Sequence, residues 1–130
     1  MELYFDGCSK GNPGPSGSGA IIKNENIIWS GCEYVGNTTN NVAEYKGLIL
    51  GLKQVKVLNI NKVIVKGDSM LVINHMTGKY KVNAPHLLLL YNEAKEILKD
   101  IDIEFLYIPR EKNKEADYLA NKGLKNSLTD

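Results

Sequence analysis

The stretch from Leu3 to Gly19 constrains this chain more than any other part of the sequence. A short apolar run carries one acid, Asp6, and the stretch holds five of the chain's twelve glycines. The alternation around Asp6 predicts a β-strand, in which successive side chains point to opposite faces. Asp6 then shares a face with Tyr4 and Cys8 and looks toward a protein layer. A carboxylate there is costly to desolvate unless a positive charge compensates it, and a metal ion held by further carboxylates would supply that charge.

The totals favour one globular domain spanning residues 1–130. Hydrophobic residues make up 43% of the chain and charged residues 24%, a balance typical of a soluble protein. No apolar run approaches the roughly 18 residues needed to span a bilayer, and the acidic N-terminus lacks the basic region of a secretory signal. Cys8 and Cys32 are widely spaced, which predicts reduced thiols in a cytoplasmic protein. A net charge of +1 argues against a strongly basic nucleic-acid clamp but allows a local basic patch.

The order of the predicted elements indicates an α/β fold. The first strand should break into a glycine-rich loop, followed by two strands that form an antiparallel meander with it, and then by a loop over 36–41. Apolar spacing predicts further strands at 61–66 and 101–108, and helices at 42–57, 70–76, 85–98 and 114–124.

A strand, helix and strand in succession imply parallel pairing through a crossover. The first and fourth strands should therefore be neighbours, with the helix over 42–57 packed across them. Gly47 and Gly51 lie four residues apart in that helix, where each costs about 1 kcal/mol relative to alanine. We interpret both as positions where the helix approaches the sheet closely.

Four acids are candidate ligands, and each has a plainer alternative. Asp6 precedes a glycine, as turn residues do. Glu44 fits a capping box that starts at Asn41, and Asp68 could cap the helix that follows it. Asp117 could be a solvated helix charge.

In combination the four acids favour a metal site. Asp6 and Asp68 end neighbouring strands, at the edge where open α/β sheets bind ligands, and the first turn of the helix carrying Glu44 can reach the same edge. Clustered carboxylates repel one another unless cations bind, and oxygen ligands suit Mg²⁺, with Mn²⁺ as a substitute. Two such ions about 3.5–4 Å apart would serve an in-line displacement at a phosphodiester.

At this point the chain resembles the type 1 ribonucleases H, in their compact form without a basic handle. The resemblance spans nearly the whole chain in the family's order, and it rests on four motifs together: Asp6-Gly7 with Gly11-Asn12-Pro13-Gly14; Thr38 through Glu44; Gly67-Asp68-Ser69; and Ile108 through Asn113 followed by Ala116-Asp117-Tyr118-Leu119-Ala120.

The resemblance implies a five-stranded mixed sheet flanked by helices, and an endonuclease that hydrolyses the RNA strand of RNA–DNA hybrids. Asp6, Glu44, Asp68 and Asp117 would hold two magnesium ions. Water attack with a 3′ leaving oxygen would give 5′-phosphate and 3′-hydroxyl ends. The residues expected to touch the hybrid are Cys8, Asn12, Asn40 and Asn41 in its minor groove, where amides can address 2′-hydroxyls, and Arg110 at a phosphate.

Three departures from the family pattern bear on substrate handling. The loop before the last acid offers Arg110 instead of a histidine, and Met70 stands where many relatives have a glutamine. The stretch between Tyr80 and Pro85 is too short for a basic handle. We interpret His75 and His86 as structural or solvated residues.

Two other functions remain open from the sequence. One is another metal-dependent nuclease on the same fold, such as an exonuclease, although those usually carry two acids two residues apart on the first strand. The other is a catalytically weak nucleic-acid-binding module, against which the presence of all four acids argues. Nothing in the sequence indicates an obligate protein partner or a membrane, so we expect a monomer whose partner is the hybrid.

Overall fold

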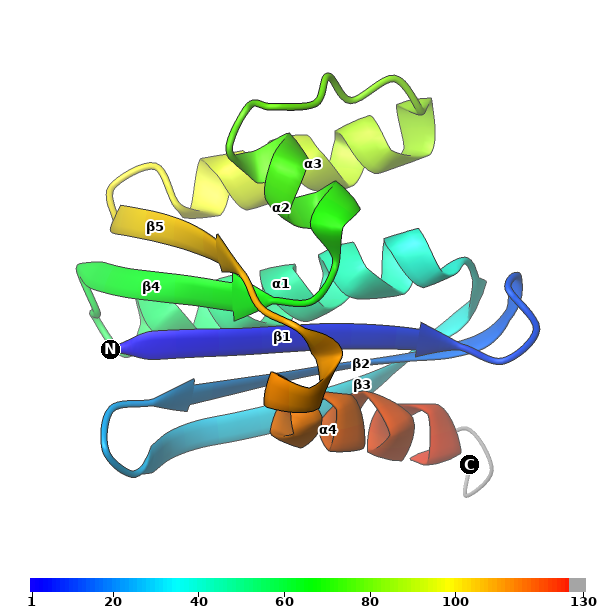
Figure 1. The fold of residues 1–130 in the computed structure, drawn as a ribbon, viewed down its shortest axis with the longest axis horizontal. Coiled ribbons are helices and arrows are strands. Elements are labelled where there is room, and N and C mark those ends of the chain that lie inside the picture. The colour runs from blue at the N-terminus through cyan, green and yellow to red at the C-terminus, as the bar shows by residue number, and fades with distance from the viewer. Residues whose placement is uncertain (127–130) are drawn as a thin grey trace.

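A computed structural model describes residues 1–126 as a five-stranded sheet with helices on both faces. The elements are β1 (Glu2–Ser9), β2 (Gly14–Lys23), β3 (Ile27–Thr38), α1 (Asn40–Val57), β4 (Lys62–Gly67), α2 (Met70–Met76), α3 (Pro85–Ile97), β5 (Asp102–Tyr107), a 3₁₀ turn (Arg110–Lys112) and α4 (Lys114–Lys125). The strand order is β3-β2-β1-β4-β5, with β1 in the middle of the sheet (Figure 1). This arrangement confirms the predicted mixed sheet.

The pairing follows the predicted meander and crossover. β1 pairs with β2, and β2 with β3, in antiparallel register. β1 pairs with β4, and β4 with β5, in parallel register. Because β1 joins the two halves, its carboxyl end lies where the antiparallel and parallel parts of the sheet meet.

The two faces of β1 serve different purposes. Leu3 and Phe5 are fully buried on the face covered by α1, within the main apolar core. That core comprises Leu3, Phe5, Ala20, Ile22, Tyr45, Leu48, Ile49, Leu52, Val55, Val63, Val65, Val72, Ile73, Met76, Leu87 and Ala94. Asp6 alternates with these residues and is also buried, on the face over which α4 packs. The core therefore fixes the strand that presents Asp6.

The expectation of a glycine-rich loop after Asp6 is wrong. β1 continues to Ser9 and β2 begins at Gly14, so only residues 10–13 form the turn. Gly17 and Gly19 lie inside β2, against α4. A Cβ at Gly17 would lie 2.3 Å from the Ala120 carbonyl oxygen, and one at Gly19 would lie 2.6 Å from the Ala120 nitrogen. These glycines allow α4 to pack directly on β2, because any side chain at either position would clash with the helix backbone.

The predicted loop over 36–41 is also mostly regular structure. β3 extends to Thr38, and Thr39 is the N-cap of α1, its hydroxyl accepting a hydrogen bond from the Val42 amide at 3.3 Å. The capping-box alternative for Glu44 is therefore wrong, because the helix begins earlier than the pattern suggested. Asp68 is likewise not a cap, since the Ser69 hydroxyl caps α2 by accepting from Val72.

The segment between α2 and α3 contains no further helix, as the short spacing predicted. Among residues 1–126, none of the helices combines the length and the apolar character that crossing a membrane requires.

Candidate active site

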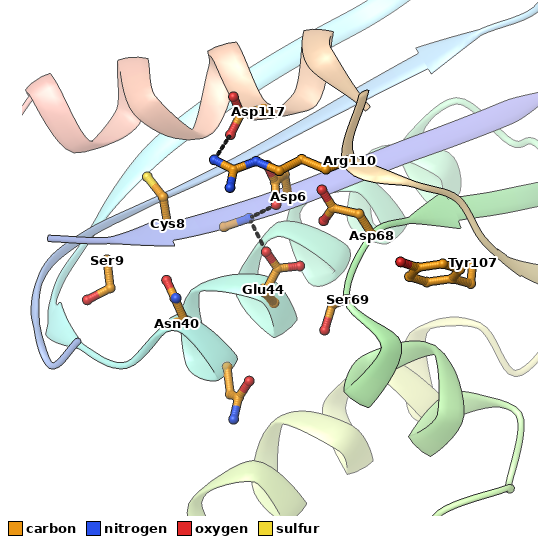
Figure 2. A pocket seen from close by; sticks show the side chains of 12 residues that line it. Asp6, Cys8, Ser9, Asn40, Glu44, Asp68, Ser69, Tyr107, Arg110 and Asp117 are labelled. Carbon is orange, nitrogen blue, oxygen red and sulfur yellow. Dashed lines mark hydrogen bonds and ion pairs between the residues drawn. The ribbon is translucent and has the colours of Figure 1, made fainter. Parts of the chain in front are cut away.

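Three carboxylates converge at the carboxyl end of the central strands (Figure 2). Asp6, Glu44 and Asp68 each offer one oxygen, and these oxygens all lie within 4.8 Å of one another. Asp6 comes from β1, Glu44 from the second turn of α1, and Asp68 directly follows β4. Phe5 and Gly67 are the last pair in the β1–β4 ladder, so Asp6 and Asp68 are the next residues on neighbouring parallel strands.

Gly7 allows Glu44 to join the two aspartates. The Gly7 amide donates to Oε1 of Glu44 and to Oδ1 of Asp6, both at 2.9 Å. A Cβ at Gly7 would lie 2.2 Å from the Ala43 carbonyl carbon, so a side chain there would push the helix away. Ser18 anchors the same turn, its hydroxyl donating to the Ala43 carbonyl at 2.6 Å. The start of α1 is thus held by a backbone amide of β1 and by a side chain of β2.

The cluster is electrostatically unfavourable without a cation. Burial raises the pKa of Asp6 to about 7, and the charge of Asp68 adds to that rise while the hydrogen bond with Glu44 opposes it. Burial, followed by the hydrogen bond and charge of Asp6, raises the pKa of Glu44 well above its ordinary value. Burial also raises the pKa of Asp68. Cations would favour the charged forms of all three groups.

The chemistry of these donors fits a divalent metal ion. Oε2 of Glu44 is buried and has no hydrogen-bond partner among residues 1–126. Leaving a buried carboxylate oxygen unpaired is costly unless a ligand occupies the position beside it. Carboxylate oxygens are the ligands preferred by hard divalent cations. The buried, unpaired oxygen and the mutual repulsion of the carboxylates therefore both favour a divalent cation at this position.

Asp117 lies on the opposite rim, outside the group of three. It projects from the first turn of α4, with 33% of its side chain exposed, and its Oδ1 lies 3.9 Å from Nη2 of Arg110. The guanidinium of Arg110 also counteracts the rise in the pKa of Asp68. Figure 2 shows Arg110 extending across the site between these two acids.

The acids line an open hollow of about 440 Å³. Of the substrate-contacting residues predicted from the resemblance, Cys8, Asn40, Asn41 and Arg110 line it. Asn12 is not among its lining residues, and its side-chain oxygen accepts a hydrogen bond from the Asn40 amide at 2.9 Å. It therefore orients the start of α1 from the β1–β2 turn.

Sequence reasoning missed three side chains of this hollow, namely Ser9, Ser69 and Tyr107. Tyr107 ends β5, which is parallel to β4, so its carboxyl end reaches the same edge of the sheet. Applying the strand-end argument to the fifth strand would have found it. Ser69 belongs to the quoted motif, but only its neighbour Asp68 was assigned a role.

A second hollow adjoins the first. It measures about 580 Å³ and shares Asn41 with the acidic hollow. Lys79, Tyr80 and Lys81 from the α2–α3 segment line it, together with His75. Nδ1 of the buried His75 lies 2.6 Å from the hydroxyl of Tyr45, and burial lowers the pKa of this histidine. His86 is exposed. An acidic hollow and a basic one thus lie side by side.

Comparisons with known proteins agree with this geometry. Residues 4–123 match the family model described as "Reverse transcriptase-like". The bifunctional protein Rv2228c of Mycobacterium tuberculosis is 40% identical over 128 residues, which cover 95% of this chain and 35% of that protein. The chain thus spans about a third of the length of that protein.

Two solved structures are similar over nearly their whole length. The crystal structure of RNase H1 from Halobacterium salinarum has a TM-score of 0.92 at 36% identity, covering 96% of this chain and 97% of that one. LC11-RNase H1, solved in complex with an RNA/DNA hybrid, has a TM-score of 0.92 at 37% identity, covering 98% of each chain.

Proposed function

Because this chain belongs to the ribonuclease H family and is of the compact type 1 form, we propose that it hydrolyses the RNA strand of RNA–DNA hybrids with the help of divalent metal ions. The observation that carries the proposal is the convergence of Asp6, Glu44 and Asp68, whose oxygens lie within 4.8 Å of one another and which line an open hollow. LC11-RNase H1, which binds such a hybrid, has the same fold at 37% identity.

We assign the four acids to metal binding. Asp6, Glu44 and Asp68 would provide the buried ligands, and Asp117 the exposed one on the opposite rim. Two bound Mg²⁺ ions, replaceable by Mn²⁺, would activate a water molecule and neutralise charge on the phosphate. The protein's own contribution is to hold four carboxylates in place around one reacting group.

The reaction is an in-line hydrolysis of a phosphodiester. The oxygen of a water molecule forms a bond to phosphorus as the bond to the 3′ oxygen breaks. The water loses a proton and the departing 3′ oxygen gains one, which leaves 5′-phosphate and 3′-hydroxyl ends. Solvent water can reach the acids directly, because the hollow that they line is open.

Selectivity for a hybrid would come from the amides beside the acids. Asn40 and Asn41 line the acidic hollow where α1 begins, and Asn12 orients Asn40. Amide groups at a minor groove can bind 2′-hydroxyls without reading base sequence. Since Asn41 also lines the second hollow, one strand could pass the acids while the other lies near Lys79 and Lys81.

The first experiment is a substrate panel. Labelled RNA–DNA hybrid, double-stranded RNA and double-stranded DNA are incubated with Mg²⁺, Mn²⁺ or a chelator. We expect cleavage of the hybrid only, with metal only, and 5′-phosphate ends. Equal cleavage of double-stranded DNA, or 2′,3′-cyclic ends, would contradict the proposal. A purified, folded protein that binds hybrid without cutting it would instead support the catalytically weak binding module.

A salt series tests the role of the basic hollow. With roughly two to four phosphate contacts, the slope of log affinity against log salt should be about −2 to −4. Replacing both Lys79 and Lys81 by alanine should flatten it by up to about 2 and weaken all hybrid sequences alike. The measurement is hybrid binding in Ca²⁺, with Lys56→Ala at the far end of α1 as the matched control. An unchanged slope would remove the α2–α3 segment from the interface.

A further inference from the structure

Asn113 is the residue at which α4 joins the rest of the site. It is 1% exposed, and its side-chain nitrogen donates to the Phe5 carbonyl at 2.9 Å. Phe5 immediately precedes Asp6 on β1. The same asparagine accepts a hydrogen bond from the Asp117 amide through its own carbonyl, at 3.0 Å. One residue thus connects the backbone beside the first acid to the backbone of the last.

The side chain of Asn113 is not used for the purpose its position suggests. It is the N-cap of α4, where asparagine commonly accepts hydrogen bonds from the first free amides of a helix. Here the side chain makes no capping hydrogen bond and turns instead to β1. Its Oδ1 is buried without a partner among residues 1–126. The side chain therefore does not stabilise the helix end as a cap, and it instead binds a strand that is distant in sequence.

The contact between Asn113 and Phe5 is made at the end of the β1–β4 pairing. Phe5 and Gly67 form the last β1–β4 pair, and beyond them Asp6 and Asp68 face the hollow. Asn113 therefore binds β1 at the last residue before the acids. Its backbone N–H also donates to the Arg110 carbonyl at 2.9 Å, so the loop that carries Arg110 is held by the same residue.

We propose that Asn113 is a positioning residue, which fixes the carboxylate of Asp117 relative to that of Asp6 through its hydrogen bond to the Phe5 carbonyl. The proposal rests on the proposed function, because it assigns Asp117 to metal binding. Asp117 lies outside the group of three buried acids, and its side chain is one-third exposed. Its place opposite Asp6 therefore depends on where α4 begins.

The test replaces Asn113 by serine, which caps a helix well but is too short to reach Phe5. Binding of Mn²⁺ is measured by titration calorimetry without substrate. We expect Asn113→Ser to weaken Mn²⁺ binding about tenfold and to raise the Mg²⁺ concentration for half-maximal cleavage similarly, as for other residues that orient metal ligands. Hybrid affinity in Ca²⁺ should change less than about twofold, and Asn113→Ala should repeat the pattern.

A double-mutant cycle separates positioning from general stability. In the Asp117→Asn background, Asn113→Ser should change Mn²⁺ affinity less than about twofold, because the ligand it orients is already gone. Val55→Ala, which removes a buried side chain from α1 far from the acids, is the control for loss of stability alone. It should lower the melting temperature and leave Mn²⁺ affinity unchanged.

Two outcomes would overturn the positioning role. One is an Asn113→Ser protein with wild-type Mn²⁺ affinity, and the other is a full additional loss in the Asp117→Asn background. Wild-type protein that binds Mn²⁺ but fails to cut hybrid would refute the proposed function and leave the role of Asn113 to be decided by the cycle. Wild-type protein that binds no Mn²⁺ would refute both.

Discussion

Helices α1 and α4 cover opposite faces of one sheet and each delivers an acid from an early turn, yet they are held in different ways. α1 buries a broad face that includes Tyr45, Leu48, Leu52 and Val55. The buried residues of α4 are Ala116, Ala120 and Gly123. Small residues bury little apolar area, and hydrophobic stabilisation is roughly proportional to that area. The core holds α1, whereas α4 depends more on individual polar contacts.

The acids differ in the same way as their helices. Glu44 is buried and receives a hydrogen bond from the Gly7 amide. Asp117 is partly exposed, and the guanidinium of Arg110, whose side chain is 81% exposed, lies nearby. Besides the hydrogen bond from Asn113 to Phe5, α4 is held by an ion pair in which Oε1 of Glu115 lies 2.7 Å from Nζ of Lys23. The site thus combines a rigid half, fixed by broad apolar packing, with a more weakly held half, in which α4 depends on close packing against the glycines of β2 and on a few polar contacts.

Replacing the acid on each helix should give the largest difference in activity between the two halves of the site. Glu44→Gln should lower hybrid cleavage by at least about 10³-fold, roughly 4 kcal/mol, because a buried ligand is lost. Asp117→Asn should lower it by about 10- to 100-fold, since an exposed ligand can be replaced in part by water. Single-turnover rates at saturating Mg²⁺ measure both, with melting curves to confirm folding. Equal losses would mean that the exposed half is as strictly required as the buried one.

Glycine substitutions test the two packing contacts. Gly47→Ala and Gly19→Ala should each lower the free energy of unfolding by about 1–3 kcal/mol through overpacking. A Cβ at Gly47 would lie 2.4 Å from the Asp6 carbonyl oxygen, and one at Gly19 would lie 2.6 Å from the Ala120 nitrogen. The measurement is chemical denaturation.

Gly51→Ala is the matched control on α1. A Cβ there would meet the end of the Leu3 side chain at 2.4 Å, which can move more readily than backbone, and the helix gains about 1 kcal/mol in propensity. Gly51→Ala should therefore lower the free energy of unfolding by less than Gly47→Ala does. A stable Gly19→Ala protein would show that α4 is not seated on β2 as described.

The buried acids should make the metal-free protein less stable as pH rises. Asp6, Glu44 and Asp68 have raised pKa values when folded, so the folded state binds more protons than the unfolded state. Their stabilising contribution is present below the ordinary carboxyl pKa of about 4 and is lost as pH rises toward about 7, where Asp6 titrates. The loss should amount to a few kcal/mol at most.

Melting curves with chelator between pH 4 and pH 8 measure this effect. Glu44→Gln should flatten the pH dependence, and Mg²⁺ should restore stability at the high end of the range. Glu104→Gln, on exposed β5, serves as the surface control. A wild-type protein that gains stability across this interval would contradict the electrostatic account of the site.

The smallest effect is expected from Arg110, on the weakly held half. Its ion pair with Asp117 is long and exposed, and such pairs contribute little. Arg110→Ala should strengthen Mn²⁺ binding without substrate by less than about threefold, because a competing cation is removed. The change should vanish at high salt, where exposed charges are screened. A loss of Mn²⁺ affinity would show that Arg110 supports the acid instead of competing for it.

The rigid half was also the more predictable from sequence. Gly47 and Gly51 interrupt an otherwise clear helical pattern, so the sequence itself indicates their packing role. The parallel pairing of β1 and β4 then placed Asp6 beside Asp68. Both inferences depend on local pattern and on a strong rule of chain topology.

The other half depends on contacts that local pattern does not record. Gly17 and Gly19 resemble loop residues, because a strand with few side chains lacks the alternation of apolar and polar residues. Glycine is needed at both positions because α4, about a hundred residues later in the chain, packs against them. Asn113 has the sequence signature of an N-cap, and only the structure shows its side chain turned to Phe5. The assignment of Asn12 to the hybrid came from the family resemblance and stays a prediction. The structure adds that its side-chain oxygen accepts a hydrogen bond from the Asn40 amide. The metal, the localisation and the oligomeric state stay predictions.

The hydrogen bond between Asn113 and Phe5 has a consequence for the order in which the protein assembles. It joins residues 108 positions apart, so it closes a loop that contains most of the chain. Closing long loops is entropically unfavourable until other contacts have shortened them, and contacts distant in sequence slow folding. We therefore expect the sheet and α1 to form first, and α4 to dock last. During synthesis on a ribosome, the three buried acids would therefore meet before Asp117 reaches its place beside them.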